Sequence, residues 1–375
     1  MMTVKNLAAL ALLGGLLAGC SVFSSSTAPK PAGLEQITPA IAGRVVWSGR
    51  VESVKFPLSV AAVADQFVVA GGDGTVQALQ ASDGRSLWSV NVGQKLAAGV
   101  GSDGRFAAVV TTANEVVALD AGQVIWRKTL PTPAVAAPRV AGERVFVLTV
   151  DRQVHAFDAK NGDKIWILRR PGEPLTLAQP GVLGVFKDTL IVGQGTRLAG
   201  VDPLRGTIRW EASVANPRGT NEVERLADLV GPLMRSGETL CARAFQSAVG
   251  CVNAERGSLI WTRNVGGTLG VGGDASRVVG GDASDRLSAW NTANGDVLWT
   301  AEQFLNRRLS APLSLGATVI VGDFEGQVHF ISAATGKTQL RLPTDGSAIA
   351  AAPVALGNTI LITTRNGGLF AMRPE

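Results

Sequence analysis

A glycine followed four positions later by a tryptophan recurs along this chain at intervals of about forty residues. Seven copies are complete, and an eighth has leucine in place of tryptophan. The pairs are Gly43–Trp47, Gly84–Trp88, Gly122–Trp126, Gly162–Trp166, Gly206–Trp210, Gly257–Trp261, Gly295–Trp299 and Gly336–Leu340. Every tryptophan except Trp290 belongs to the pattern. A period near forty residues indicates stacked copies of one supersecondary unit.

Each repeat is predicted to contain four short strands. An apolar run such as Val76–Leu79 or Val154–Phe157 precedes most of the glycines, with polar turn residues between them. A glycine beside such residues predicts a hairpin turn, so the tryptophan strand should pair antiparallel with the strand before it. Upstream lie a β-branched run such as Val145–Val150 and a further segment that often reads Ala-Pro, without helical periodicity. Four strands per forty residues is typical of a propeller blade.

The two ends of the chain complement each other. The first pair, Gly43–Trp47, has no strand motif before it, and the last motif, Leu369–Met372, has no glycine and tryptophan after it. Seven complete units and one split unit predict an all-β fold, an eight-bladed β-propeller of four-stranded antiparallel blades over residues 42–375. N- and C-terminal strands in one blade would close it without a free sheet edge there. One tryptophan per blade should pack between neighbouring sheets, with its N–H bonded to a carbonyl across the interface.

The first nineteen residues have the pattern of an export signal. Lys5 precedes the apolar stretch Leu7–Leu17, which is too short to span a bilayer. The sequence Leu17-Ala18-Gly19-Cys20 resembles the lipobox of bacterial lipoproteins, which implies cleavage before Cys20 and acylation of that residue. Ser21, rather than aspartate, implies sorting to the outer membrane. Residues 20–41 are then predicted to be a lipidated flexible tether. The alternative is an ordinary signal peptide that contains a cysteine.

Composition narrows the function classes. The formal net charge is +5 and 17% of residues are charged, without a dense Lys/Arg run. A mildly basic solvated surface explains this charge, and nucleic acid is not an expected partner.

Cys241 and Cys251 fall on adjacent strands of one hairpin, equidistant from its turn. In an oxidising periplasm they could form a disulfide, and a pair of reduced buried thiols is the equal alternative.

No catalytic constellation can be recognised. The only histidines, His155 and His329, occupy the same position of their repeats, so they are not expected to converge on a metal site or a triad. The glycine pairs do not lie between a strand and a helix, as a nucleotide-binding loop would require. The sequence therefore predicts no enzyme, no cofactor and no metal.

The repeat resembles that of the quinoprotein propellers, enzymes that bind pyrroloquinoline quinone. Those enzymes carry adjacent cysteines at the quinone and acidic residues around calcium, and this chain has neither. The chain has a lipobox, a tether and eight blades with nothing after them. This organisation resembles that of BamB, the family of propeller lipoproteins in the outer-membrane β-barrel assembly machinery. The resemblance spans the whole chain.

This resemblance implies a partner site. The family has a Thr-Glu-x-x-Arg-Leu-x-Asp segment, matched within residues 219–228, and a Leu-x-Leu segment one blade earlier; both contact a POTRA domain of BamA. The corresponding residues here are two apolar anchors, Leu175 and Leu177, and two polar contacts, Arg225 and Asp228. Ala178 and Val230 depart from the pattern, where the family has arginine and a second aspartate. Blade core is the alternative place for the leucines.

The predicted function is thus a lipid-anchored scaffold on the periplasmic face of the outer membrane, which binds BamA and assists the insertion of β-barrel proteins. Two other function classes stay open: a small periplasmic quinoprotein-type enzyme and a propeller lipoprotein that binds polymers. The sequence also leaves open whether nascent outer-membrane proteins bind directly.

Overall fold

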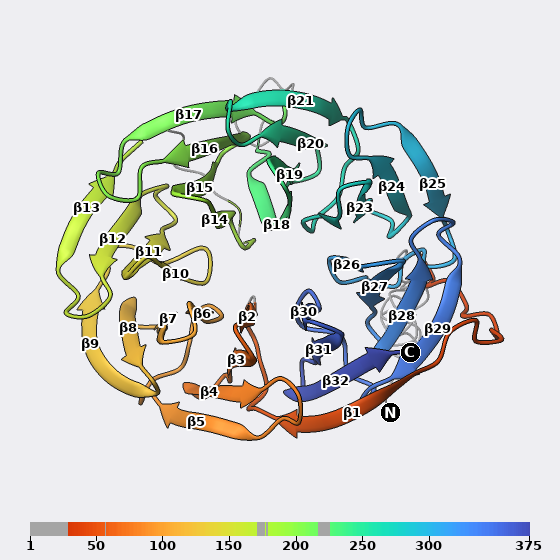
Figure 1. The fold of residues 1–375 in the computed structure, drawn as a ribbon, viewed down its shortest axis with the longest axis horizontal. Coiled ribbons are helices and arrows are strands. Elements are labelled where there is room, and N and C mark those ends of the chain that lie inside the picture. Colours follow the sequence, from red (N-terminus) through yellow and green to blue (C-terminus); the bar gives the residue numbers. More distant parts are fainter. Residues whose placement is uncertain (1–28, 57, 171–176, 178, 217–225) are drawn as a thin grey trace, which may run out of the picture. The chain divides into compact units, whose positions relative to one another are not determined.

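Eight four-stranded antiparallel sheets make up the folded part of the chain. The computed structural model describes residues 29–56, 58–170, 177, 179–216 and 226–375, and its main compact unit spans Ala32–Glu375. Within this unit the sheets stand side by side as blades around a ring (Figure 1). The predicted all-β, eight-bladed propeller is confirmed.

We number the blades in chain order, and within each blade the strands run from the innermost to the outermost (Figure 1). Blades 1 to 4 hold β2 (Ala61–Val63), β3 (Gln66–Ala70), β4 (Thr75–Gln80) and β5 (Ser86–Asn91); β6 (Gly101–Ser102), β7 (Phe106–Val110), β8 (Glu115–Asp120) and β9 (Gln123–Thr129); β10 (Arg139–Ala141), β11 (Arg144–Leu148), β12 (Val154–Asp158) and β13 (Lys164–Leu168); β14 (Leu183–Phe186), β15 (Thr189–Gln194), β16 (Arg197–Val201) and β17 (Ile208–Ser213).

The remaining strands form blades 5 to 8 in the same way. They are β18 (Leu229–Ser236), β19 (Thr239–Ala244), β20 (Ala248–Asn253) and β21 (Ser258–Arg263); β22 (Gly272–Gly273), β23 (Arg277–Gly281), β24 (Leu287–Asn291) and β25 (Val297–Ala301); β26 (Leu313–Leu315), β27 (Thr318–Gly322), β28 (Gln327–Ser332) and β29 (Thr338–Pro343); and β30 (Val354–Leu356), β31 (Thr359–Thr363) and β32 (Gly368–Pro374), followed by β1 (Gly43–Arg50).

The ring closes through blade 8, as predicted. The N-terminal strand β1 pairs antiparallel with the C-terminal strand β32, from Gly43 opposite Pro374 to Arg50 opposite Gly368. The sheet order β1-β32-β31-β30 places β1 at the outer edge of this blade (Figure 1). Two segments from opposite ends of the sequence therefore form one sheet.

The glycine of each repeat packs on the tryptophan of the preceding blade. A Cβ added to Gly162 would lie 2.7 Å from the ring of Trp126, and one added to Gly295 would lie 2.6 Å from Trp261. Both glycines have positive φ, +73° and +74°, which side-chain-bearing residues rarely adopt. Leu340 takes the tryptophan's place against Gly43, since a Cβ there would lie 2.6 Å from its Cδ2.

Five of the seven repeat tryptophans donate their indole N–H across a blade interface, as predicted, and no such bond to a described residue is found for Trp88 or Trp210. Trp126 donates to the carbonyl of Ala159 at 2.8 Å. Four more tryptophans bond to the next blade in the same way: Trp47 to Ala81, Trp166 to Pro203, Trp261 to Thr292 and Trp299 to Ala333. Each bond spans the layer of apolar side chains between two sheets, so the core of the ring is a series of such layers.

The two remaining cysteines lie opposite each other in blade 5. Cys241 in β19 is the register partner of Cys251 in β20, their Cα atoms are 4.0 Å apart, and a disulfide joins them. Such a short separation is that of a non-hydrogen-bonded pair in an antiparallel sheet. Both side chains are fully buried.

The compact unit begins earlier than the sequence suggested. Residues 32–41 fall in the predicted tether, yet Ala32 donates its N–H to Leu305 O and Ala40 donates to Gln339 O, both at 2.8 Å. Gln339 lies in β29, the outermost strand of blade 7. Because an outer strand presents unpaired backbone groups, the incoming chain can bond to it. Residues 20–28 of the predicted tether, which include Cys20, lie outside the described residues.

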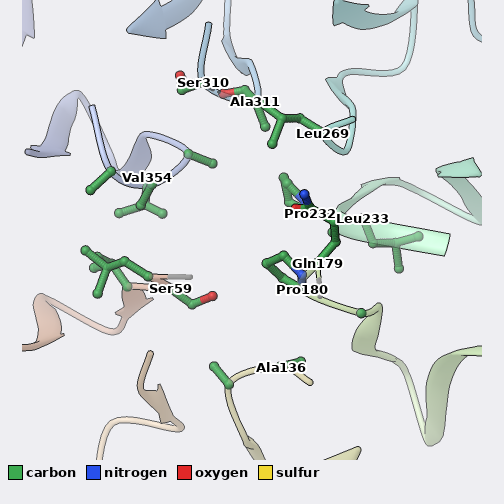
Figure 2. A pocket seen from close by; sticks show the side chains of 18 of the residues that line it. Ser59, Ala136, Gln179, Pro180, Pro232, Leu233, Leu269, Ser310, Ala311 and Val354 are labelled. Carbon is green, nitrogen blue, oxygen red and sulfur yellow. Dashed lines mark hydrogen bonds between the residues drawn. The ribbon is translucent and has the colours of Figure 1, made fainter. Parts of the chain in front are cut away.

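An axial cavity of about 990 Å³ lies inside the ring. Residues from all eight blades line it, among them Ser59, Ala136, Pro180, Leu233, Leu269, Ala311 and Val354 (Figure 2). Among the described residues, no helix is both long and apolar enough to cross a membrane.

Candidate partner-binding surface

One end of the ring carries Leu177 and Asp228, the two predicted site residues that the structure describes. Because strands alternate in direction, the connections between blades and the turns between second and third strands emerge at the same end, which we call the connection face. Leu177 lies in the connection from β13 to β14, and Asp228 directly precedes β18. The other two predicted residues, Leu175 and Arg225, lie outside the described residues.

The structure brings Leu177 and Asp228 together. One carboxylate oxygen of Asp228 accepts a hydrogen bond from the main-chain N–H of Leu177 at 3.2 Å. The other oxygen pairs with Nη2 of Arg152, also at 3.2 Å. One carboxylate therefore ties the connection after blade 3 to the connection after blade 4, and both to the second-to-third-strand turn of blade 3.

This geometry changes the role expected for Asp228. The sequence suggested a polar contact free for a partner, but only 17% of the side chain is exposed and both oxygens are engaged within the chain. We interpret Asp228 as a positioning residue that holds Leu177 at the surface. Leu177 itself is half-buried.

The sequence analysis did not identify Arg152 as a site residue. It lies in the turn between β11 and β12, 76 positions before its ion-pair partner, so no local spacing connects the two residues. Its main chain takes a positive φ of 60°. Its carbonyl accepts from Nε2 of Gln194 at 3.3 Å, and Oε1 of Gln194 in turn accepts from Arg170 at 3.0 Å. These bonds join blade 3 to the turn of blade 4.

Main-chain bonds hold the start of blade 5 in place beside this cluster. The N–H of Leu229 donates to Gly195 O at 2.8 Å, and the carbonyl of Asp228 accepts from Phe245 at 3.0 Å. Val230, where the family pattern has a second aspartate, is 2% exposed and bridges to Gly181. Its side chain is therefore not part of the exposed surface. Ala178, the other departure, lies outside the described residues.

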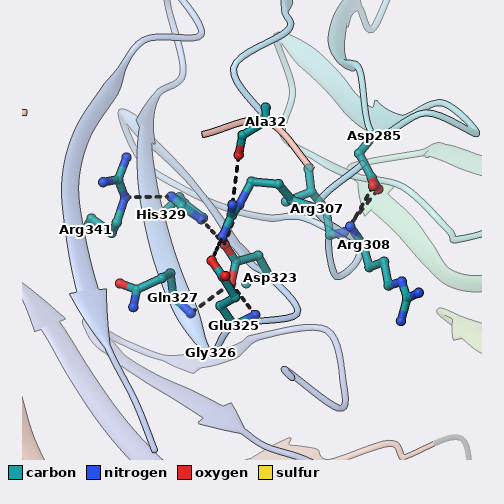
Figure 3. Close-up of polar contacts among 12 residues, drawn as sticks. Ala32, Asp285, Arg307, Arg308, Asp323, Glu325, Gly326, Gln327, His329 and Arg341 are labelled. Atoms are coloured by element: carbon teal, nitrogen blue, oxygen red, sulfur yellow. Dashed lines mark hydrogen bonds and ion pairs between the residues drawn. The ribbon is translucent and has the colours of Figure 1, made fainter. Parts of the chain in front are cut away.

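A second polar cluster holds the N-terminal segment on blade 7 (Figure 3). Arg307, almost fully buried, donates Nε to Asp323 at 2.8 Å and Nη1 to the carbonyl of Ala32 at 2.9 Å, and also pairs with Glu325. Arg341 donates to the carbonyl of Glu35 at 3.0 Å. Two buried or half-buried guanidinium groups thus clamp residues 32–35 to the propeller.

His329 connects the two arginines of this cluster. Its Nε2 lies 3.0 Å from the Asp323 carboxylate, and its Nδ1 accepts from Nε of Arg341 at 3.3 Å. Burial lowers the pKa of His329, and the positive charges of Arg341 and Arg307 add to this effect against the opposing Asp323. Despite burial, the hydrogen bonds from His329 and the Gln327 amide lower the pKa of Asp323. A neutral imidazole that donates to an ionised carboxylate satisfies both side chains.

The other predicted residues show no convergence on a reactive centre. His155 lies in blade 3 and stacks on Phe157 with ring centroids 6.2 Å apart, four blades away from His329. In the described part of the chain, no group of three or more His, Cys, Asp or Glu side chains is arranged to hold a metal ion.

Comparisons with known proteins show the family of this chain. The family described as "Outer membrane protein assembly factor BamB" matches residues 72–301. A Bordetella pertussis protein of that name is 35% identical, covering 96% of each chain, and one from Burkholderia pseudomallei is 34% identical, covering 94% of this chain and 95% of the relative. A crystal structure of BamB from Moraxella catarrhalis has a TM-score of 0.80 at 22% identity, covering 88% of this chain and all of that one. The chain therefore belongs to the BamB family of outer membrane protein assembly factors.

Proposed function

We propose that this protein is a lipid-anchored, non-enzymatic scaffold subunit of the outer-membrane protein assembly complex. Its relatives are named as outer membrane protein assembly factors, which supports the role. We further propose that it binds a POTRA domain of BamA through the connection face of blades 3 to 5. The anchor would be the acylated Cys20, which places the propeller on the periplasmic face of the outer membrane.

The observation that carries the proposed site is the bond between Asp228 and Leu177. A loop that binds a partner gains affinity when its bound conformation is already ordered in the free protein. Asp228 and Arg152 provide such order, because they fix the main chain at Leu177 from two neighbouring blades. Leu175 and Leu177 would then be the apolar anchors, and Arg225 would supply a charge beside them.

Binding of purified BamA POTRA domains, measured by isothermal titration calorimetry, tests this proposal. Truncating a central interface anchor costs about 2 kcal/mol, roughly thirtyfold in affinity, so we expect that loss for Leu177→Ala. Leu204→Ala is the matched control, because Leu204 is 57% exposed in a turn at the opposite end of blade 4. It should bind as the wild type does.

Two further variants separate positioning from direct contact. Asp228→Ala removes the acceptor of the Leu177 amide and should weaken binding, whereas Asp228→Asn keeps an oxygen acceptor and should lose less. The double change Leu175→Ala with Arg225→Glu should abolish co-purification with BamA. If all these variants are folded, by their melting temperatures, and still bind normally, the contact lies on another surface.

The two cysteines of the propeller do not have the arrangement that the quinoprotein alternative would use. Quinoprotein propellers use adjacent cysteines, whereas Cys241 and Cys251 are joined across two strands and packed inside blade 5. Neither cysteine lines the axial cavity.

A further inference from the structure

The axial cavity carries an excess of positive charge. Five cationic residues line it, Lys55, Arg139, Arg235, Arg308 and Arg365, against a single carboxylate, Asp285, among the described lining residues. Asp285 is already engaged, since it accepts the main-chain N–H groups of Arg308 at 2.6 Å and Leu309 at 3.1 Å. Low-dielectric walls around charges of one sign concentrate the field inside a cleft.

The cations lie at two levels of the ring. Lys55 and Arg308 lie in connections between blades and Arg365 in the turn between β31 and β32, all at the connection face. Arg139 pairs with Phe146 near the first turn of blade 3, and Arg235 pairs with Leu240 next to the first turn of blade 5. These two arginines are therefore deeper in the ring, toward its opposite end.

Arg139 and Arg235 lack anionic partners within the described chain. The guanidinium of Arg139 makes no hydrogen bond to a described residue, and its Nε is buried. Arg235 donates only to the carbonyl of Val185, at 3.3 Å. Burial lowers the pKa of Arg139, the positive charge of Arg235 lowers it further, and the negative charge of Asp103 opposes this effect.

Elsewhere in the molecule, arginines with little exposure either pair with carboxylates or donate to main-chain carbonyls, as the fully buried Arg243 does to Val265 and Gly281. Arg152 pairs with Asp228 and Arg307 with Asp323. The guanidinium of Arg139, whose Nε is buried without an acceptor, would be stabilised by an anion in the cavity. Aliphatic side chains such as Leu58, Leu183, Leu233 and Ile349 line the cavity between the two levels of charge.

We propose that the axial cavity is an anion site in which Arg139 and Arg235 together bind one phosphate group. A phosphate monoester carries nearly two negative charges at neutral pH, because its second pKa is about 6, so one group can neutralise both guanidiniums. A carboxylate could neutralise only one of them. The planar donor fork of arginine suits a phosphate well. The rest of the ligand would extend along the aliphatic wall toward Lys55, Arg308 and Arg365.

Calorimetric titration of the full chain in neutral detergent and phosphate-free buffer at pH 7.5 tests this site. The probes are methyl phosphate, hexyl phosphate and tripolyphosphate. The double change Arg139→Gln with Arg235→Gln should weaken binding of the probes at least tenfold. Its matched control, Arg85→Gln with Arg256→Gln, removes the same charge from two exposed outer turns and should stay within twofold of the wild type.

The three probes distinguish the source of the phosphate. Hexyl phosphate that binds more tightly than both other probes indicates a lipid headgroup whose alkyl part lies along the aliphatic wall. Tripolyphosphate as the tightest probe indicates a free polyphosphate that spans both levels of charge. Absence of binding by all three, or an equal loss in the two double variants, would overturn the proposal.

A single substitution tests the site even if the double variant misfolds. Arg235 is exposed and donates to one carbonyl only, so Arg235→Gln should fold normally and still weaken binding several-fold. Normal affinity in this folded variant would also contradict the site. Because BamA POTRA binding can be titrated on the same samples, failure of the anion site is distinguishable from failure of the proposed function.

Discussion

At the scale of single residues, the repeat glycines are constrained twice, by backbone conformation and by the neighbouring ring. Gly162→Ala would impose a positive φ on alanine and drive a Cβ to 2.7 Å from Trp126. Gly346 has a similar φ of +80° with nothing within 4 Å, so Gly346→Ala is the control for backbone strain alone. We expect the control to lose about 1–2 kcal/mol and Gly162→Ala a further 1–3 kcal/mol in urea unfolding. Equal losses would mean that contact with the ring does not matter.

The two histidines predict how stability depends on pH. Burial lowers the pKa of both His329 and His155. The unfolded chain, with histidine pKa near 6.5, then binds protons that the folded chain does not, so stability falls as pH drops below about 6.5. The charged groups that modulate these shifts are Asp323, Arg341 and Arg307 for His329, and Asp151, Arg169 and Lys164 for His155.

A variant without histidine tests this dependence of stability on pH. The melting temperature of the wild type should decrease between pH 7.5 and pH 5.5, and that of the double change His155→Gln with His329→Gln should decrease much less. Carboxylates such as Asp323 act mainly below pH 4, because their unfolded pKa is near 3.9. A wild-type melting temperature that does not change over this range would contradict the prediction.

At the scale of strands, the pairing of β1 with β32 holds the ring closed. Deleting residues 365–375 removes all of β32, the partner of β1, and exposes the apolar layers beside it. We expect aggregation or a large fall in melting temperature, measured by circular dichroism. Deleting Glu375 alone is the control, since it removes only an exposed ion pair with Arg44 and one main-chain bond to Ala42 O and should cost little. A long truncation that melted like the wild type would show that this pairing does not stabilise the ring.

The hairpin of β19 and β20 carries the disulfide between Cys241 and Cys251, ten positions apart in the sequence. Mass spectrometry of unreduced peptides should find it in exported protein. A cross-link of this loop length stabilises by about 2–3 kcal/mol, so Cys241→Ala with Cys251→Ala should lose that amount. Reduced wild-type protein should melt like the variant; a wild type that is indifferent to reduction would indicate that the two thiols are free.

At the scale of the whole molecule, the proposed lipid anchor and the contacts of Ala32 with blade 7 limit how far the propeller can lie from the membrane. From Cys20 to Ala32 the chain advances twelve residues, an extended reach of about 40 Å. Cys20→Ala should therefore remove the protein from the outer-membrane fraction, measured by immunoblotting of separated membranes, while the melting temperature of the propeller stays unchanged. Undiminished outer-membrane fractionation of this variant would disprove the lipid anchor.

The sequence by itself determined the number of blades, their four-stranded form and their closure. These features repeat locally: Gly162 and Trp166 mark a turn and an outer strand whatever the rest of the chain does, and the half-repeats at Gly43 and Leu369 can only complete each other. Periodicity and turn chemistry are short-range properties, so they can be recognised without coordinates.

The tertiary structure decided the contacts between segments that are distant in sequence. It placed Gly162 on Trp126 of the blade before, joined Asp228 to Arg152, and clamped Ala32 with Arg307 in a segment that looked like free tether. It also turned Arg139 and Arg235 toward one cavity. None of these pairs has a fixed spacing along the chain. Their proximity depends on how closed blades stack around the ring, and that geometry is set by packing rather than by local pattern.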